Sequence, residues 1–569
     1  MNTYYTDEIN ILILISLLKK HGIRKIIASP GATNITFVGS VQIDPYFEVY
    51  SAIDERAAAF IACGLAEESG EPVVLSCTGA TASRNYIPGL TEAYYRHLPI
   101  LAVTSTQHEG RIGHYIAQVI DRSQPFADMV KKSISLPTVR CEEDKQYTIT
   151  AVNDAILELN HGESGPVHIN LTTNYSNSFN VKTLPDYRTI KRIQPNSTFP
   201  DLPKGNIGIF IGAHEAFTKE ETEAIDAFCA SNNAVVICDH IGNYHGKYRF
   251  LASAVNSQPA DFGTKRFDLI IYIGYVHGAY ITYHGKQSWR VNRDGVIRDP
   301  HRNLTCVFEM EEQAFFRHYV SEESNNTIYQ TCINASKRIG KKIPELPFSN
   351  MWIAKETAHL IPNNSVLHLS ILNTLRVWNY FETQNNVLCY SNSGGYGIDG
   401  CLSSFLGSAL ANKEVSHYLV IGDLSFFYDF NAMLNEIPSN VHIMLINNGV
   451  GTEFKNYNHR AAYFGEEANP YIAAKGHNGA QSVSLVKTLC ENIGVRYISA
   501  QNKDEYLKQR DTWLQSADQP IVFEIFTNDK AESEALRRMN TIEKNISLKV
   551  RLKKSWVGRI AKRILKGGK

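Results

Sequence analysis

Residues 417–427 read HYLVIGDLSFF, and residues 441–450 read VHIMLINNGV. Each stretch begins with an apolar run typical of a buried strand and then turns polar. Asp423 follows the first run and Asn448 follows the second. Parallel strands joined by a right-handed crossover end at the same edge of a sheet, in the crevice where open α/β sheets bind ligands. We therefore expect Asp423 and Asn448 to lie side by side.

The polar residues at this edge have the chemistry of a site for a metal-bridged diphosphate. A carboxylate, a side-chain amide oxygen and a nearby main-chain carbonyl are hard donors, and Mg²⁺ combines a few such ligands with phosphate oxygens and water. A helix predicted over 426–437 would direct its free N–H groups at the same place, which suits an anion. The alternative interpretation is that Asp423 and Ser425 cap a helix and that the two asparagines form a turn.

Outward from this stretch, short apolar runs alternate with helical patterns along nearly the whole chain. Such alternation predicts parallel strands joined by helices, hence an α/β fold with open parallel sheets. Proline-containing segments at 181–204 and 340–349 divide the chain into three consecutive α/β blocks. The predicted strands are 25–29, 49–53, 73–77, 100–104, 207–211, 234–238, 269–273, 387–391, 417–421, 441–446 and 521–526.

The composition excludes several classes of protein. Of the 569 residues, 43% are apolar and 20% charged, which is typical of a globular protein and not of a disordered or fibrous one. Basic and acidic residues number 57 each, so no net field favours nucleic acid. The ten cysteines form no Cys-x-x-Cys pair, which favours reduced thiols in the cytoplasm.

Neither end of the chain predicts a segment that crosses a membrane. The apolar run 9–18 is about half the length that a bilayer span needs, and we expect a buried helix over 6–21. The tail, 544–569, carries ten basic residues and no acidic one. Its apolar residues recur at helical spacing, so we expect peripheral contact with an anionic membrane, on the inner face for a cytoplasmic protein. The alternative is a solvated or partner-docked tail.

An acidic residue in the first block stands where a helix is expected to begin. Asp54-Glu55-Arg56 follows a predicted strand and precedes the helical stretch 57–68. Glu55 is a candidate catalytic residue; the alternative is a structural one, since a carboxylate in the first turn of a helix is favoured by the helix dipole alone.

The Gly-Asp pair followed two dozen residues later by Asn-Asn resembles the Mg–thiamine diphosphate motif of the thiamine diphosphate (ThDP) enzymes. The resemblance covers nearly the whole chain before the tail. It implies a pyrimidine-binding domain over 1–185, a central domain over 186–345, a diphosphate-binding domain over 346–540 and a basic amphipathic tail over 541–569. It also implies that Asp423, Asn448 and the carbonyl of Val450 bind Mg²⁺.

The same resemblance assigns further roles. Glu55 would hydrogen-bond the aminopyrimidine ring of ThDP and relay protons, which is general acid–base work, with Gln118 as a second catalytic residue. Residues 391–407 are similar to the menaquinone-pathway synthases of the family, which would make Ile398 the wedge that bends the cofactor; the alternative is a simple core residue. The remaining predicted cofactor contacts are Gly79, Gly422, Asp423, Leu424, Ser425 and Asn448.

The chain departs from the menaquinone-pathway synthases in the residues that bind anionic substrates. Those synthases use arginines, which grip carboxylates bidentately, and most of these positions hold neutral residues here. We therefore reject the menaquinone reaction and expect decarboxylation of a short, pyruvate-like 2-oxo acid, with a carbonyl acceptor such as a sugar (carboligase) or a proton (decarboxylase). The predicted substrate contacts are Thr33, Asn34, Gln107, His108, Arg376, Ser393 and Tyr396.

Two other functions fit parts of the sequence. Residues 395–400 match G-x-G-x-x-G after a strand, with Asp423 at the distance expected of a ribose-binding acid, as in a nicotinamide-dependent dehydrogenase. Loss of the arginines would also suit a catalytically silent scaffold. The family resemblance further implies a homodimer, or a dimer of dimers (a homotetramer), with active sites between subunits.

Overall fold

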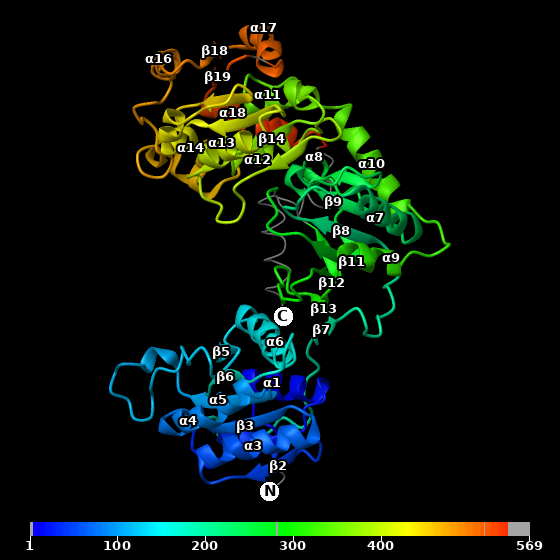
Figure 1. Cartoon of the computed structure of the whole chain (residues 1–569), viewed down its shortest axis with the longest axis vertical. Helices are drawn as coiled ribbons and strands as arrows, with labels where there is room; N and C mark the ends of the chain where they lie inside the picture. The colour runs from blue at the N-terminus through cyan, green and yellow to red at the C-terminus, as the bar shows by residue number, and fades with distance from the viewer. Residues whose placement is uncertain (1–3, 280–282, 517, 544–569) are drawn as a thin grey trace, which may run out of the picture. The chain divides into compact units, whose positions relative to one another are not determined.

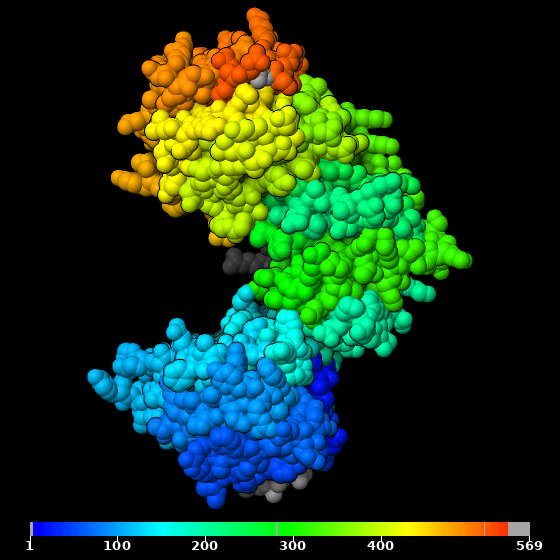
Figure 2. All heavy atoms as spheres, in the orientation of Figure 1, coloured from blue at the N-terminus to red at the C-terminus, as the bar shows by residue number. Residues whose placement is uncertain are grey.

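The computed structural model describes residues 4–279, 283–516 and 518–543. It contains three sheets of six, seven and six strands and divides into two compact units, drawn as ribbons in Figure 1 and as spheres in Figure 2. The first unit combines Met1–Phe199 with Gln287–Met310, and the second combines Pro200–Lys286 with Glu311–Lys569. The prediction of successive parallel-sheet α/β domains is confirmed. The four domain boundaries given above stay predictions.

The first unit is built on a six-stranded parallel sheet. In spatial order its strands are β2 (Glu48–Ser51), β1 (Lys25–Ala28), β3 (Val73–Thr78), β4 (Ile100–Thr106), β6 (Val167–Thr172) and β5 (Lys132–Leu136). The helices are α1 (Ile9–Lys20), α2 (Ile35–Val41), α3 (Glu55–Ser69), α4 (Thr81–Asn85), α5 (Ile87–Tyr95) and α6 (Glu142–Glu158).

Helices cover both faces of this sheet because its strands are apolar on both sides. Ile26 and Val74 belong to the core that also holds α1 and α6, whereas their neighbours Ile27 and Leu75 belong to the core with α3 and α5. Successive side chains of a strand point to opposite faces, so one apolar run feeds two helical layers. The helix predicted at 6–21 is α1, whose residues 10–18 are all buried.

The strands of the middle third are shared between the two units. The second unit holds β8 (Ile207–Ile211), β9 (Ala234–Cys238), β10 (Arg249–Leu251) and β11 (Arg266–Ile273), in the order β10-β9-β8-β11. The first holds most of β12 (His284–Val291) with β13 (Leu304–Phe308) and β7 (Lys191–Ile193), paired in parallel as β12-β13-β7. The helices here are α7 (Lys219–Ser231), α8 (Ser253–Asn256), α9 (Glu312–His318) and α10 (Thr327–Gly340).

The last third of the second unit carries another six-stranded parallel sheet. Its strands run β15 (Leu388–Tyr390), β14 (Val366–Leu369), β16 (His417–Gly422), β17 (Val441–Asn447), β19 (Ile521–Phe526) and β18 (Arg496–Ala500). The helices are α11 (Asn350–Thr357), α12 (Asn373–Trp378), α13 (Cys401–Ala411), α14 (Asp423–Tyr428), α15 (Thr452–Lys455), α16 (Leu485–Asn492), α17 (Lys503–Leu514) and α18 (Asp529–Met539).

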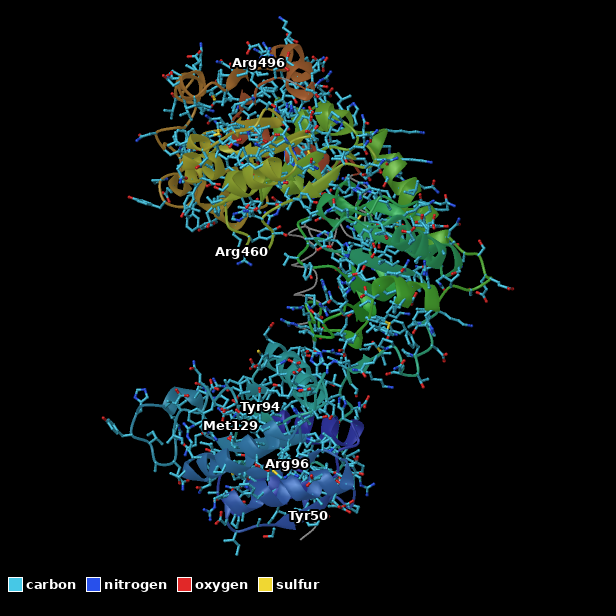
Figure 3. All side chains as sticks on the ribbon, in the orientation of Figure 1. Tyr50, Tyr94, Arg96, Met129, Arg460 and Arg496 are labelled. Atoms are coloured by element: carbon cyan, nitrogen blue, oxygen red, sulfur yellow. The ribbon has the colours of Figure 1, made fainter. Side chains whose placement is uncertain are left out.

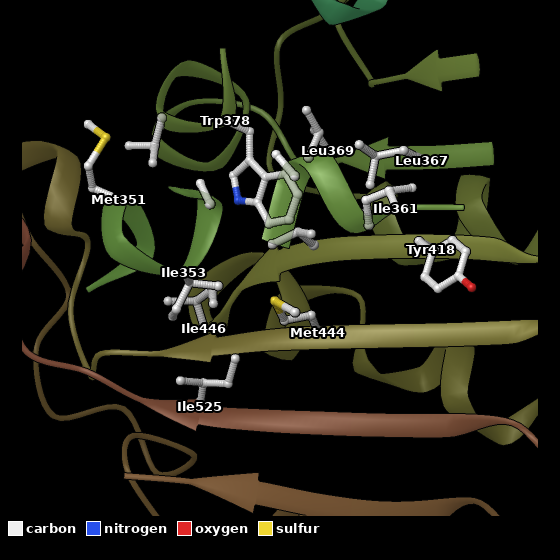
Figure 4. Packing of buried hydrophobic residues seen from close by; sticks show 14 of the residues in the cluster. Met351, Ile353, Ile361, Leu367, Leu369, Trp378, Tyr418, Met444, Ile446 and Ile525 are labelled. Carbon is white, nitrogen blue, oxygen red and sulfur yellow. The ribbon is translucent and has the colours of Figure 1, made fainter. Parts of the chain in front are cut away.

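This sheet also separates two cores. Figure 4 shows one of them, in which Trp378 of α12 and Met351 and Ile353 of α11 lie over side chains of the central strands, among them Met444 and Ile446 of β17. Alternate residues of the same strands pack with α13, α14 and α16 on the other face. Large buried side chains of this kind contribute roughly 1.5–3 kcal/mol each, which holds the strand ends, and the residues that follow them, in place.

The structure corrects two local predictions. Residues 191–193, inside the predicted linker, form β7. The single helix expected over 426–437 is instead the short α14, from Asp423 to Tyr428, followed by a 3₁₀ turn at Phe430–Leu434. The helix ends at Asp429, whose backbone leaves the helical conformation (φ −112°, ψ 20°) and whose carboxylate accepts hydrogen bonds from the main-chain nitrogen and the hydroxyl of Ser403, both at 2.6 Å.

The cysteines and the apolar helices bear on two further predictions. All ten cysteines are free thiols, and nine of them are buried. Among the described residues no helix has the length and apolar character needed to cross a bilayer. The basic tail at 544–569, predicted to contact a membrane, lies outside the described residues.

Candidate functional site

Asp423 lies at the carboxyl end of β16 and begins α14. Its side chain is almost fully buried, and its Oδ2 accepts a hydrogen bond from the main-chain nitrogen of Gly449 at 2.8 Å. The ring of His477 lies against the same oxygen, with Nε2 at 3.2 Å. Because Gly422 pairs with Ile446 in the register of β16 and β17, the two strands end together, as the sequence predicted.

The two asparagines that follow β17 do different things. Asn447 is fully buried and donates to the carboxylate of Glu524 at 2.7 Å, while its own oxygen accepts from Gln481 N at 3.0 Å. Asn448 is half-buried, lines a cavity and accepts only a long bond, 3.4 Å, from Val450 N. Asn447 therefore anchors the strand end, and the amide oxygen of Asn448 remains suited to a ligand.

The buried carboxylate of Glu524 holds Asn447, and with it the end of β17, in place. Glu524 on β19 takes hydrogen bonds from Asn447 and from the hydroxyl of Tyr497 at 2.8 Å. Burial raises the pKa of Glu524, against the effect of these two donors. Nothing near Glu524 in the sequence predicted this support.

A cavity of about 1030 Å³ opens at this edge of the sheet, within the second unit. The predicted cofactor and metal residues that line it are Ile398, Gly422, Asp423, Leu424, Ser425, Asn448 and Val450. One carboxylate, one amide oxygen and one main-chain carbonyl would leave room in an Mg²⁺ octahedron for phosphate oxygens and water. The described residues contain no group of three His, Cys, Asp or Glu able to hold a metal by themselves. The donor set therefore fits Mg²⁺ carried together with a diphosphate.

Ile398 is held beside the predicted cofactor-binding residues by a hydrogen bond. The Ser425 hydroxyl donates to the main-chain oxygen of Ile398 at 2.6 Å, and the Ile398 side chain is partly buried against the core under α13. Tyr396 and Ser393 lie in the same loop: the Tyr396 hydroxyl donates to Gly278 O at 2.9 Å, and Ser393 is buried. The structure thus brings Ser425 and Ile398 together, and it ties Tyr396 to another loop.

Arg376 of α12, the predicted anion contact, has an acidic partner. Its guanidinium forms an ion pair with Glu453 Oε1 at 2.5 Å, and both side chains are mostly buried on the cavity wall. With its amide placed to satisfy its neighbours, Asn373 donates to the other oxygen of Glu453 at 2.8 Å. Sequence reasoning missed Glu453, because nothing marks a pair separated by 77 positions.

Glu55 lies at the first position of α3 in the first unit, as predicted. Asp54 is the N-cap, and its side chain accepts from Ala57 N at 3.1 Å. Because Asp54 satisfies one of the free N–H groups at the start of the helix, the Glu55 side chain is not needed as the cap. The carboxylate of Glu55 is half-buried, and it forms no hydrogen bond or ion pair within the described part of the chain, so its position is compatible with a contact to a ligand.

Gly79 follows β3 in a crowded place. A Cβ there would lie 2.7 Å from the main-chain oxygen of Ser105 and 2.8 Å from the guanidinium of Arg122. Arg122, which sequence reasoning missed, is buried and donates to Thr104 Oγ1 at 2.7 Å and to Asn170. Burial lowers the pKa of Arg122 to about 10.

The other predicted residues of the first unit fall into two groups. Thr33 and Asn34 are buried and bonded internally: Thr33 donates to Ser105 O at 2.7 Å, and Asn34 donates to Ser29 O at 2.9 Å. Both side chains therefore have a structural explanation. Gln107, His108 and Gln118 lie in the loop region after β4, where Gln107 donates to the Tyr175 hydroxyl at 3.2 Å, His108 caps a short turn, and Gln118 is exposed with φ of 63°.

Comparison with known proteins identifies the family of this chain. Residues 12–124 match the family model described as thiamine pyrophosphate enzyme, N-terminal TPP binding domain. The chain is 30% identical to the 2-succinyl-5-enolpyruvyl-6-hydroxy-3-cyclohexene-1-carboxylate synthase of Bacteroides thetaiotaomicron, over 94% of this chain and 98% of that protein. The synthase of Phocaeicola vulgatus is 29% identical over the same shares.

The chain belongs to the thiamine diphosphate-dependent enzymes. Among them it is similar over its full length to the 2-succinyl-5-enolpyruvyl-6-hydroxy-3-cyclohexene-1-carboxylate synthases. One solved structure, a thiamine diphosphate-dependent 4-hydroxybenzoylformate decarboxylase of Rhodococcus jostii, covers 91% of this chain and 99% of its own at 17% identity and a TM-score of 0.38. That likeness is too weak to carry an argument about function.

Proposed function

We propose that this protein uses thiamine diphosphate and Mg²⁺ to decarboxylate a short, pyruvate-like 2-oxo acid. The remaining acyl unit is passed to a carbonyl acceptor, as in a carboligase, or is released by protonation, as in a decarboxylase. When bound, thiamine diphosphate supplies the carbon nucleophile and the electron sink for loss of carbon dioxide. The 2-succinyl product of the relatives is not proposed, because the arginines expected for its carboxylates are mostly absent.

One observation carries the proposal. Asp423, Asn448 and Val450 line one wall of the same cavity, at the carboxyl ends of two neighbouring parallel strands. In our proposal, the Asp423 carboxylate and the Asn448 amide oxygen hold the metal, with the Val450 carbonyl as third ligand. Ser425 fixes the segment that carries Ile398, whose side chain would press on the middle of the cofactor.

Glu55 is proposed as the proton-relay residue, with Gln118 and Gly79 beside the same ring. A carboxylate held against a ring nitrogen can move a proton to and from it. We propose that two copies of the chain assemble so that Glu55 of one copy serves the diphosphate site of the other, giving a homodimer or a dimer of dimers. We place the protein in the cytoplasm, with the basic tail as its contact with the inner face of the membrane.

Cofactor choice tests the proposal first. Purified protein with ThDP and Mg²⁺ should show a raised melting temperature, and with NAD⁺ it should not; the reverse result would support the dehydrogenase read from residues 395–400. Removal of the metal with EDTA should cancel the effect of ThDP.

Activity is tested by carbon dioxide release from a panel of short 2-oxo acids. Glu55→Gln should abolish release and keep ThDP binding, since only the proton relay is removed. Release that is unchanged in this variant would contradict the assignment of Glu55. No release from any acid by a protein that binds ThDP would favour the silent scaffold.

A further inference from the structure

The cavity beside Asp423 extends well beyond the residues proposed to hold the diphosphate. Its other walls come from α8, α12, the segment 452–460 and the end of α18. Polar residues lining this outer part include Ser253, Asn256, Arg376, Tyr380, Glu453, Tyr457 and Asn540. We call them the outer subsite.

Charge in the outer subsite is balanced internally. The Arg376–Glu453 ion pair joins its two charged members, and Asn373 holds the second oxygen of Glu453. An incoming carboxylate could bind Arg376 only by breaking a mostly buried pair and by approaching the Glu453 carboxylate, and both steps are costly. The cavity is also lined by the charged residues Asp423, Glu532 and Arg460.

Those other charges do not change the balance of the subsite. Asp423 lies at the diphosphate wall, and Glu532 is bonded to the main-chain nitrogen of Asn350 and the hydroxyl of Thr527. Arg460 is exposed at the edge of its unit, where Figure 3 labels it.

Neutral hydrogen-bonding groups fill the remainder of the outer subsite. The Asn256 oxygen accepts from Thr264 at 3.0 Å, but its buried amide nitrogen has no partner among the described residues. Asn540 bridges two phenols: it accepts from the Tyr380 hydroxyl at 2.6 Å and donates to the Tyr457 hydroxyl at 3.1 Å. Because Tyr457 accepts that bond, its own proton is left to donate to a ligand.

A buried amide donor without a partner costs free energy that a ligand oxygen would recover. Tyr457 adds a partly exposed aromatic face, against which the C–H groups of a carbohydrate pack. Such donors and faces suit a molecule rich in hydroxyl groups.

We propose that the outer subsite binds an uncharged, hydroxyl-rich acceptor of the sugar class, and that Glu453 determines this specificity by neutralising Arg376. The inference rests on the proposed function in one respect, namely that the bound molecule is the acceptor of the reaction. Binding of this molecule does not itself require the cofactor. Tyr457 and Asn256 supply donors to the hydroxyl oxygens, and Glu453 excludes carboxylated compounds of the same size.

The test compares erythritol, a four-carbon polyol, with succinate, a four-carbon dicarboxylate. Saturation-transfer NMR on the cofactor-free full chain reports the binding of each probe. Wild-type protein should bind erythritol and give little signal with succinate. Equal binding of the two, or a preference for succinate, would overturn the proposal.

Three variants sharpen this comparison. Glu453→Gln should strengthen succinate binding about tenfold, because Arg376 then lacks its acidic partner. Tyr457→Phe should weaken erythritol binding about fivefold and leave succinate unchanged, as expected for one lost hydrogen bond. Glu491→Gln, an exposed acid on α16 outside the cavity, is the matched control and should change neither. Unchanged succinate binding in Glu453→Gln, with the melting temperature preserved, would remove Glu453 from the argument.

Failure of this proposal and of the proposed function look different. If the protein gains stability from ThDP and Mg²⁺ but shows no preference for erythritol, the proposed function stands and the proposal for the outer subsite is contradicted. If the protein prefers erythritol but its melting temperature does not rise with ThDP, the proposal for the outer subsite stands and the proposed function is contradicted.

Discussion

Glu532 gives a quantitative test of how burial acts on a charge in the second unit. It stands in the first turn of α18 and is 8% exposed. Its carboxylate accepts from Asn350 N, at 2.9 and 3.0 Å, and from Thr527 Oγ1 at 2.7 Å. Desolvation outweighs these bonds and raises the pKa of Glu532 from its ordinary value of 4.5 to about 7.

The direction of the effect follows from proton uptake. Between pH 4.5 and 7 the folded protein holds a proton on Glu532 that the unfolded chain has lost, so this residue favours folding most below pH 4.5. That contribution is lost as pH rises through about 7. A change from 4.5 to about 7 corresponds to about 3 kcal/mol, at about 1.4 kcal/mol for each factor of ten in acidity.

The perturbation is Glu532→Gln, which cannot ionise. The free energy of unfolding of the wild type should fall relative to the variant by about 3 kcal/mol between pH 5 and pH 8. Urea titrations followed by tryptophan fluorescence measure this, because Trp378 donates to Asn350 Oδ1 at 3.1 Å and so reports on the same helix ends. Glu534→Gln, an acid bonded to Arg537 and Arg538 on the same helix, is the control. If the free energies of unfolding of the wild type and of Glu532→Gln change in parallel with pH, burial does not raise the pKa of Glu532.

Three further substitutions test the supports of the site. Asn447→Leu should lower the free energy of unfolding by about 3 kcal/mol, since it removes one of the two donors to the buried Glu524 carboxylate and the acceptor of Gln481 N; chemical denaturation measures this, and a loss below about 1 kcal/mol would contradict the role. Ser425→Ala should weaken ThDP binding about fivefold in calorimetric titration, through loss of the bond to Ile398 O, and should leave the melting temperature of the cofactor-free protein unchanged. Gly79→Ala should cost about 1–3 kcal/mol because its Cβ would clash with Ser105 O; an unchanged melting temperature would show that the loop yields freely.

Several interior strands could be predicted from sequence because they are buried on both faces, although the interior strands β6 and β14 were missed and the edge strands β2 and β15 were predicted. β3, β16, β17 and β19 are apolar runs with every residue, or all but the last, buried. The edge strand β18 has mixed burial and was missed. At an edge one side of the strand meets solvent or a loop, so the apolar pattern that marks a strand is diluted.

The residues at the site divide in the same way. Asp423 and Asn448 could be predicted because each directly follows a recognisable strand, and the parallel topology then places them together. His477 and Glu524 could not, because His477 comes from a loop without a pattern, and the strand that carries Glu524 gives no sign that this side chain contacts Asn447. The position of a residue that directly follows a strand can be inferred from the sequence. The position of a partner from a distant part of the chain is set only when the chain folds.

Arg376 shows the limit of carrying a residue over from a resemblance. The side chain is present where an anion contact was expected, yet Glu453 neutralises it within the same cavity wall. A guanidinium that is paired and mostly buried differs from one that awaits a carboxylate, because the partner acid neutralises its charge and uses one of its donors. Whether an arginine recognises an anion therefore depends on the acids folded against it, and in this protein that acid, Glu453, comes from the segment just after Asn448, the proposed metal ligand.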